Sequence, residues 1–184
     1  MNFEFYPQSI QDVILVKPRV FTDERGFFME SYKKSDFVKN GIVNDFVQDN
    51  YSKSTVHVLR GLHFQEEPYS QAKLVRCIRG KIYDIAVDLR PESPTFKKYI
   101  KVELSDTNNH QLFIPKRFAH GFVVLSEEAE VCYKTDCEYN STADKGVFWA
   151  DEDLNIDWGI DFTPIISTKD KMLPKLKEIK LWDS

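Results

Sequence analysis

The sequence predicts an all-β protein, a jelly-roll barrel or double-stranded β-helix with a few short helices. Three observations support this prediction. Apolar and polar residues alternate in many short runs, turn residues separate the runs at regular intervals, and helical and strand patterns do not alternate along the chain. About ten short strands without β-α-β order indicate an antiparallel sandwich or barrel.

The clearest strand covers residues 83–89, where the apolar side chains at odd positions share one face and Asp84, Ala86 and Asp88 share the other. Residues 100–104 alternate in the same way. Between the strands, Arg79–Lys81 predicts a tight hairpin around Gly80, and residues 91–94 and 105–109 predict loops.

Helical patterns are confined to two places. We expect one helix at residues 35–40, capped by Ser35 and ended by Gly41, and a second in the lysine-rich tail from Lys169. Neither is long enough to change the fold class.

The chain of 184 residues is long enough to bury a substantial core, and no repeat or linker divides it. We therefore expect one domain over residues 1–184. A net charge of −4 argues against nucleic-acid binding. Since the chain has neither a signal peptide nor an apolar run long enough to span a bilayer, and an odd number of cysteines without a close pair, we expect a cytoplasmic protein without a membrane partner.

The strongest candidates for chemistry are His63 and Lys73, two ionisable residues on separate strand-like runs among apolar side chains. In a regular strand Arg60 and His63 would point to opposite faces, but a bulge at Gly61 would turn both into one cavity. A merely structural, hydrogen-bonded histidine is the alternative. Lys73 shares a face with Val75, so its burial would lower its pKa, whereas a solvated strand end would leave it ordinary.

Two further residues lie on interior faces or at strand entries. Tyr133 shares its face with Val131 and Thr135, and a phenol in such a position can donate a proton as well as pack. His120 leads into an apolar run. Most inward-facing tyrosines have only a structural role. Tyr133 and His120 therefore indicate a site only because they occur together with His63 and Lys73.

A metal site is the competing explanation, because cupin-type jelly rolls often hold a metal on a His-x-His pair with a nearby Glu and a later His. The four histidines here are His57, His63, His110 and His120, and no two of them are two residues apart. We therefore expect no metal and no cofactor, with acid and base residues in the cavity instead.

Six segments together resemble the dTDP-4-dehydrorhamnose 3,5-epimerase family. They are FTDERGFFME at 21–30, QDNYS at 48–52, VLRGLHFQ at 58–65, QAKLVRCIRGKIYDIAVDLR at 71–90, IPKRFAHGFVVLS at 114–126 and STKD at 167–170. The resemblance implies a metal-free jelly roll that forms a homodimer by exchanging N-terminal strands. Its substrate would be a dTDP-linked 4-keto-6-deoxy sugar, inverted at both carbons beside the ketone.

The resemblance also implies a role for each matching residue. His63 would be the general base, Asp170 its carboxylate partner, Tyr133 the proton donor, and Lys73 the group at the ketone oxygen. Substrate binding would involve Arg25, Glu30, Gln48, Asp49, Asn50, Arg60, Lys73, His120, Tyr139, Asp144 and Lys169, with Arg25 reaching across the dimer and Tyr139 stacking on the thymine. The chemistry of the reaction is consistent with these implied roles. Forming an enolate needs a base at the carbon and a cation at the ketone oxygen, and inversion needs an acid on the opposite face.

Three positions depart from the family pattern. Arg117 stands where glycine is usual, which would alter the loop or add a phosphate contact. Asp144 stands where glutamate is usual, and Thr168 replaces a common acid.

Three alternatives to the double epimerase stay open. An epimerase of one carbon or a ketoisomerase would use the same base and oxyanion group. A sugar-binding module would need no His63, Lys73 and Asp170 set, and a metal-dependent oxygenase would need the metal ligands that are missing.

Overall fold

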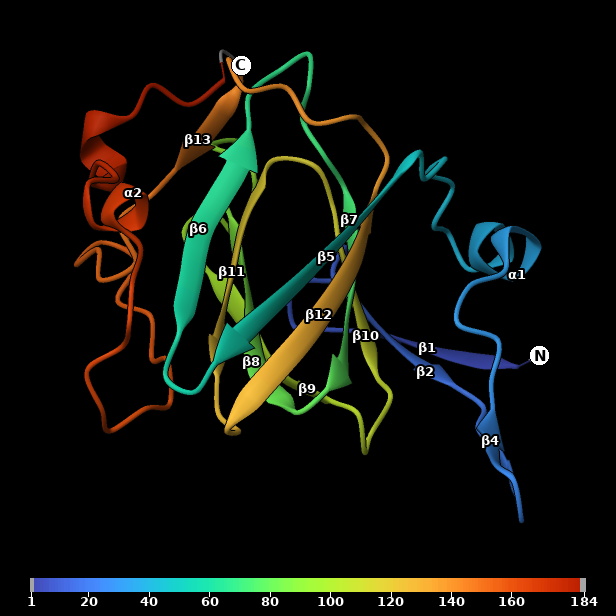
Figure 1. The fold of residues 1–184 in the computed structure, drawn as a ribbon. Helices are drawn as coiled ribbons and strands as arrows, with labels where there is room; N and C mark the ends of the chain where they lie inside the picture. Colours follow the sequence, from blue (N-terminus) through green and yellow to red (C-terminus); the bar gives the residue numbers. More distant parts are fainter. Residues whose placement is uncertain (1, 183–184) are drawn as a thin grey trace.

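The computed structural model describes residues 2–182, and within this range two antiparallel sheets face each other while a small hairpin stands apart (Figure 1). The six-stranded sheet has the order β1 (Phe3–Pro7), β2 (Ile14–Pro18), β10 (Gln111–Ile114), β7 (Lys73–Arg79), β12 (Glu128–Thr135) and β5 (Gln48–Thr55). The five-stranded sheet has the order β13 (Asp144–Gly146), β6 (Leu59–Gln65), β11 (Phe118–Val124), β8 (Lys81–Asp88) and β9 (Tyr99–Ser105). The hairpin consists of β3 (Phe21–Asp23) and β4 (Gly26–Phe28).

The all-β jelly-roll prediction is confirmed, with thirteen described strands instead of about ten. The expected domain, residues 1–184, extends past the described residues at Met1 and at 183–184. Neither α1 (Lys34–Lys39) nor α2 (Thr168–Lys171) has the length or the apolar character to cross a bilayer, and η1 (Leu176–Glu178) is a single 3-10 turn.

The main core fills the space between the sheets. Val75 and Val131 come from the six-stranded sheet, while Ile82, Leu104 and Phe122 come from the five-stranded one, and all five are buried. Apolar residues of facing strands therefore form one continuous layer, as expected for a sandwich that closes into a barrel.

Strand β8 is buried on both faces. Ile82 and Ala86 belong to the core between the sheets, whereas Ile85 and Val87 pack against the C-terminal segment, which covers the outside of the five-stranded sheet (Figure 1). The predicted alternation is confirmed, but the face that carries Asp84 is the interior one. A buried charge in the barrel is a feature that alternation alone does not reveal.

The hairpin predicted around Gly80 is wrong, although the tight turn exists. Strand β7 pairs with β10 and β12, and β8 pairs with β11 and β9, so the turn connects the two sheets. Gly80 has φ +77, and a Cβ there would lie 2.1 Å from the carbonyl oxygen of Glu128. Turn residues thus mark the reversal of the chain but not the strand's partner.

Helix α1 begins at Lys34, not Ser35, and its N-cap is Lys33, without a side-chain cap. Phe37 holds the helix instead, because it is fully buried against Phe3 and Phe5 of β1. Tertiary packing therefore replaces the predicted cap. The tail is α-helical over α2 and forms the 3-10 turn η1 further on. At the start of α2 the Ser167 hydroxyl accepts the backbone N–H of Asp170 at 3.0 Å.

Candidate active site

A cavity of about 570 Å³ lies between the sheets, next to the C-terminal segment. Its walls come from β5, β6, β7, β11, β12 and β13, from Tyr139 between β12 and β13, and from residues 165–170. Ten of the predicted site residues line it: Asn50, Arg60, His63, Lys73, His120, Tyr133, Tyr139, Asp144, Lys169 and Asp170. The fold therefore gathers residues that are up to 120 positions apart in the sequence into one site.

The bulge predicted in β6 is confirmed. His63 pairs with His120 and Arg60 pairs with Phe122, so three steps along β6 match two steps along β11. Gly61 has φ +122, and a Cβ there would lie 2.6 Å from the Cα of Gly121. Only glycine fits this close approach, and the extra residue lets Arg60 and His63 face the same cavity.

His63 is paired with Asp170 of α2 across the cavity wall. The Nε2 atom of His63 lies 2.8 Å from Oδ1 of Asp170, and the backbone N–H of Gly61 donates to Oδ2 at 3.2 Å. Burial favours a raised pKa for Asp170, but the hydrogen bonds and charge of its neighbours prevail and lower it. An ionised carboxylate only accepts, so Nε2 is the donor and Nδ1 is left to take a proton.

Lys73 is the first residue of β7 and is buried, with 8% of its surface exposed. Burial lowers the pKa of Lys73 to about 8, while the charges of Asp84 and Asp144 partly offset this effect. Its ammonium lies 5.9 Å from the centre of the Tyr133 ring. The solvated strand end is therefore excluded, and the cavity contains a cation close to its titration point.

Tyr133 enters the cavity from β12 and packs against the main core. Burial raises the pKa of Tyr133, the charge of Arg60 lowers it, and that of Asp144 raises it. The phenol is therefore protonated at neutral pH and available as a donor.

Asp84 is a site residue that sequence reasoning missed. It is fully buried on β8, and its Oδ1 lies 2.8 Å from Nε2 of His120, a residue 36 positions later. The signal was present in the alternation of residues 83–89, which set Asp84 on the polar face, but nothing in the sequence paired that face with His120.

Three residues meet at the mouth of the cavity. The Tyr139 hydroxyl donates to Oδ2 of Asp144 at 3.0 Å, and Nζ of Lys169 donates to the same oxygen at 2.5 Å. Asn50 accepts from Gln48, whose own side-chain oxygen accepts the backbone N–H of Tyr139. Asp144 thus holds Tyr139 and Lys169 together, and Gln48 supports this rim without lining the cavity.

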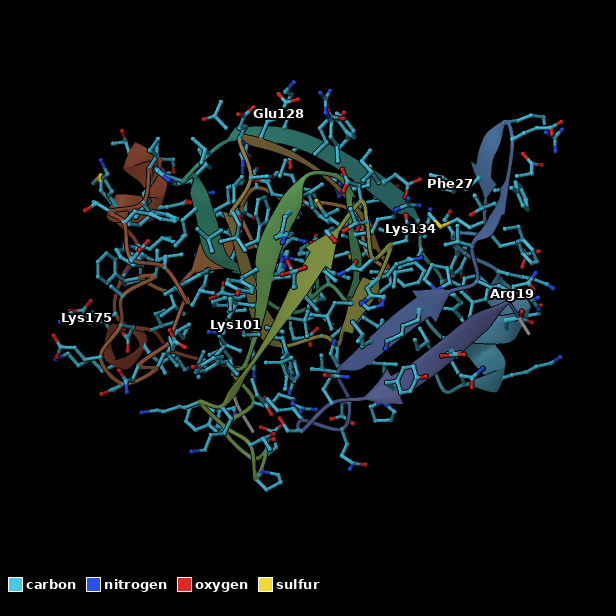
Figure 2. All side chains as sticks on the ribbon, turned by 90° about the horizontal axis from the view of Figure 1, so that it is seen from below. Arg19, Phe27, Lys101, Glu128, Lys134 and Lys175 are labelled. Atoms are coloured by element: carbon cyan, nitrogen blue, oxygen red, sulfur yellow. The ribbon has the colours of Figure 1, made fainter. Side chains whose placement is uncertain are left out.

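Three other predicted ligands lie away from the cavity of their own chain. Arg25 is at the tip of the β3–β4 hairpin, paired with Asp23, and its side chain is 85% exposed. Glu30 accepts from Asn2, and Asp49 pairs with Lys134 outside the cavity. Figure 2 shows Phe27 of the hairpin on the opposite side of the molecule from Lys175 of the C-terminal segment.

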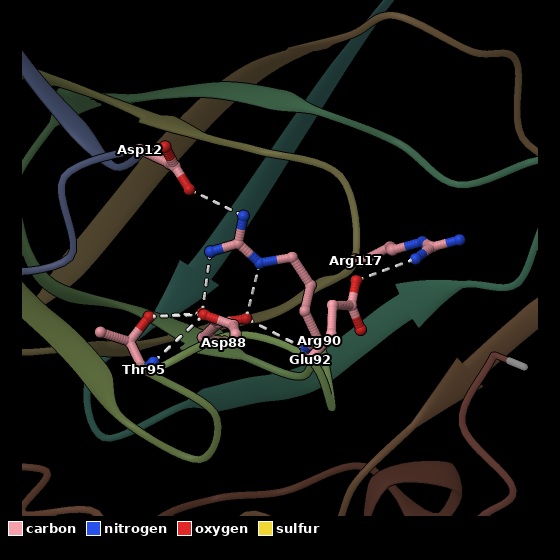
Figure 3. Close-up of polar contacts among 7 residues, drawn as sticks. Asp12, Asp88, Arg90, Glu92, Thr95 and Arg117 are labelled. Atoms are coloured by element: carbon pink, nitrogen blue, oxygen red, sulfur yellow. Dashed lines mark hydrogen bonds and ion pairs between the residues drawn. The ribbon is translucent and has the colours of Figure 1, made fainter. Parts of the chain in front are cut away.

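Arg117 has φ +65, a backbone conformation that favours glycine. Its guanidinium pairs with Glu67 and Glu92 and lies over the ring of Trp182. Figure 3 shows its contact with Glu92. Because Arg117 does not line the cavity, the structure supports a loop contact for it and not the phosphate contact.

Among residues 2–182, no three His, Cys, Asp or Glu side chains are grouped so that they could hold a metal ion. The histidine and aspartate side chains that line the cavity are paired separately instead: His63 with Asp170, His120 with the buried Asp84, and Asp144 with Lys169.

The family model of dTDP-4-dehydrorhamnose 3,5-epimerase matches residues 7–178. A relative of that name from Shigella flexneri is 53% identical over 163 residues, 88% of this chain and 90% of the relative. The structure of a dTDP-4-dehydrorhamnose 3,5-epimerase from Elizabethkingia anophelis NUHP1 is 45% identical and covers 97% of this chain and 98% of its own, with a TM-score of 0.92. A dTDP-6-deoxy-D-glucose-3,5-epimerase from Legionella pneumophila Philadelphia 1, in complex with dTDP-4-keto-L-rhamnose, is 37% identical and covers 99% of this chain and all of its own, with a TM-score of 0.94.

Proposed function

Because the chain belongs to the dTDP-4-dehydrorhamnose 3,5-epimerase family, we propose that it converts dTDP-4-dehydro-6-deoxy-D-glucose into dTDP-4-dehydro-L-rhamnose by inverting C3 and C5. The observation that supports this most directly is one cavity with a histidine–carboxylate pair, a buried ammonium and a protonated phenol. These are the groups that a proton shift beside a ketone requires.

In this mechanism, Nδ1 of His63 takes the proton from the carbon beside the ketone, and the C–H electron pair moves into an enolate. Asp170 stabilises the imidazolium that forms, and the Lys73 ammonium stabilises the negative enolate oxygen. Tyr133 then donates its proton to the opposite face of the same carbon. The resulting phenolate takes a proton from solvent, and the His63 imidazolium releases the proton it removed to solvent, so that both groups return to their starting states. The sequence repeats at the second carbon.

For the rest of the substrate, we propose that Arg60 and Lys169 bind the diphosphate and that Tyr139 stacks on the thymine. Guanidinium and ammonium groups at the cavity wall suit phosphate oxygens, and the half-exposed Tyr139 ring lies at the mouth, where a base would project. Asn50 and His120 offer hydrogen bonds to the sugar.

The decisive experiment is incubation with dTDP-4-keto-6-deoxyglucose in deuterated water, followed by NMR. The proposal expects deuterium at both C3 and C5 and formation of the L-rhamno product. Label at one carbon alone would indicate an epimerase of a single carbon, and no label would contradict the enzyme proposal.

We also propose a homodimer that exchanges N-terminal strands, in which Arg25 reaches the partner's cavity. The β3–β4 hairpin supports this proposal, because it extends from the barrel with Phe27 and Phe28 60% and 67% exposed. Light scattering should give twice the chain mass. Arg25→Ala should raise KM while leaving the mass unchanged, and a monomeric active enzyme would contradict the proposal.

A cytoplasmic location is proposed as well. Its support is the cysteine pattern, in which Cys77, Cys132 and Cys137 are all unpaired, as in proteins of reducing compartments. Cell fractionation would test it.

A further inference from the structure

Asp84 is a buried carboxylate to which the proposed mechanism gives no role. Its Oδ1 accepts from Nε2 of His120, but its Oδ2 has no hydrogen-bond partner among the described residues. A buried carboxylate oxygen without a donor destabilises the folded protein, so its presence requires an explanation. Packing does not provide one, since an apolar side chain on β8 would fill the same space.

Two of the groups on which this carboxylate acts belong to the cavity. Its charge acts on Lys73 of β7 and on His120 of β11, which line the cavity. Besides the larger effect of burial, it also raises the pKa of the buried Cys77 thiol, which does not line the cavity. The other titratable or charged groups around Lys73 and its neighbours are Asp144, Tyr133, His63 and Arg60. Asp84 thus places a negative charge near Lys73, the proposed oxyanion group. Burial alone would favour the neutral amine of Lys73, and the charge of Asp84 favours the ammonium.

The hydrogen bond also sets the chemistry of His120. Since Nε2 points at a carboxylate, Nε2 carries the ring proton, and burial lowers the pKa of His120 so that the ring is neutral at pH 7. A neutral ring with its proton on Nε2 presents Nδ1 as an acceptor. Nδ1 can therefore accept a hydrogen bond from a sugar hydroxyl but not from the ketone, which has no proton to donate.

We propose that Asp84 is a positioning residue of the epimerase site, which fixes the tautomer of His120 and supplies the negative charge that keeps Lys73 protonated until the ketone oxygen arrives. This inference rests on the proposed function for its catalytic meaning. Its electrostatic part concerns Asp84 and Lys73 alone and is measurable without substrate.

Asp88 provides a matched control on the same strand. Both aspartates are fully buried and neither lines the cavity, but the carboxylate of Asp88 accepts hydrogen bonds from Arg90, Ser93 and Thr95 (Figure 3). The charge of Asp84 acts on Lys73, whereas that of Asp88 is not among the charges that do. Removing its charge should lower the melting temperature without affecting Lys73. A change at Lys73 in the Asp84 variant alone would therefore be specific.

The experiment titrates the Lys73 ammonium by NMR of the lysine-labelled full chain, with Lys73→Arg to assign the signal. In Asp84→Asn the pKa of Lys73 should fall by about 1 unit below the wild-type value of about 8, because an opposite charge is lost. The alkaline limb of kcat/KM should move in the same direction. The loss of activity should then be about fivefold greater at pH 8 than at pH 6, since the protonated fraction falls from about a half to about a tenth.

In Asp88→Asn and His120→Asn the Lys73 titration should stay at the wild-type value, since both retain the Asp84 charge. An unchanged titration in folded Asp84→Asn would overturn the proposal. If that variant does not fold, His120→Asn decides instead, because a fall of about 1 unit in the pKa of Lys73 there, with the Asp84 charge retained, would overturn the proposal. A wild-type enzyme that does not turn over would contradict the proposed function alone, since the NMR titration needs no substrate.

Discussion

Two histidine–aspartate pairs, His63–Asp170 and His120–Asp84, have the same Nε2 to Oδ1 distance of 2.8 Å. Both residues of the first pair line the cavity, whereas only the histidine of the second does. The side chains of the first pair are 33% and 5% exposed, and those of the second are 7% and 0% exposed. The first joins β6 to the C-terminal α2, whereas the second joins neighbouring strands inside the barrel. The two pairs therefore share the same Nε2 to Oδ1 distance and differ in how far their side chains are exposed.

That difference supports the proposal that His63 transfers protons and that Asp84 positions His120. Both oxygens of Asp170 accept hydrogen bonds, and its lowered pKa keeps it ionised beside a ring that reaches open space. Asp84 leaves one oxygen without a partner among the described residues, and the His120 ring beside it lines the cavity but is only 7% exposed. A histidine–aspartate pair therefore serves as a base only where the imidazole has room for the group it deprotonates.

The largest expected effect distinguishes the two histidines. His63→Ala should abolish deuterium exchange at both carbons, a loss of at least about 10³-fold, because the proposed base is gone. His120→Asn should lower kcat/KM by about tenfold and leave exchange measurable, because the ring supplies hydrogen bonds and not proton transfer. NMR in deuterated water measures both. Full activity of the His63 variant would make the base assignment wrong.

Asp170→Asn should reduce kcat by about 10²-fold with a smaller change in KM. The amide keeps the shape of the carboxylate but removes the charge that stabilises the imidazolium. Steady-state kinetics measures kcat and KM separately and so tests this expectation. Equal losses from Asp170→Asn and Asp88→Asn would trace the effect to lost stability, not to the pair.

Tyr133→Phe should slow inversion by about tenfold or more, while exchange at the same carbon is less affected. The variant retains the ring that packs against the main core and removes only the donated proton. The ratio of washed-in deuterium to inverted product reports this difference. An unchanged ratio would assign the second proton to another group, with His120 the first to be tested.

The smallest effect is on stability in acid. The folded pKa of Asp170 is lowered, so its stabilising contribution is complete above the unfolded value of about 3.9 and is lost as pH falls through the folded value. Wild type should lose free energy of unfolding below about pH 4 more steeply than Asp170→Asn. Urea unfolding at several pH values measures this, and parallel curves would contradict it.

Several local features were predictable because they depend on short-range rules. Period-two alternation identified interior faces for Lys73 and Tyr133, and Gly61 marked the bulge that brings Arg60 and His63 together. Helix ends and strand partners were less predictable. The predicted cap at Ser35 was wrong, because packing of Phe37 fixes the start of that helix. The predicted hairpin at Gly80 was wrong, because the strands on either side pair with strands distant in the sequence.

The sequence by itself determined the all-β class and which neighbours share a strand face with Lys73 and Tyr133, and its resemblance to a family supplied their expected roles. Only the tertiary structure decided that Asp84 faces the barrel beside His120, that Asp170 reaches His63 from 107 positions away, and that Arg25 lies outside its own cavity. The reason is physical. Alternation fixes which side chains share a face, but burial and charge depend on what the rest of the chain packs against that face.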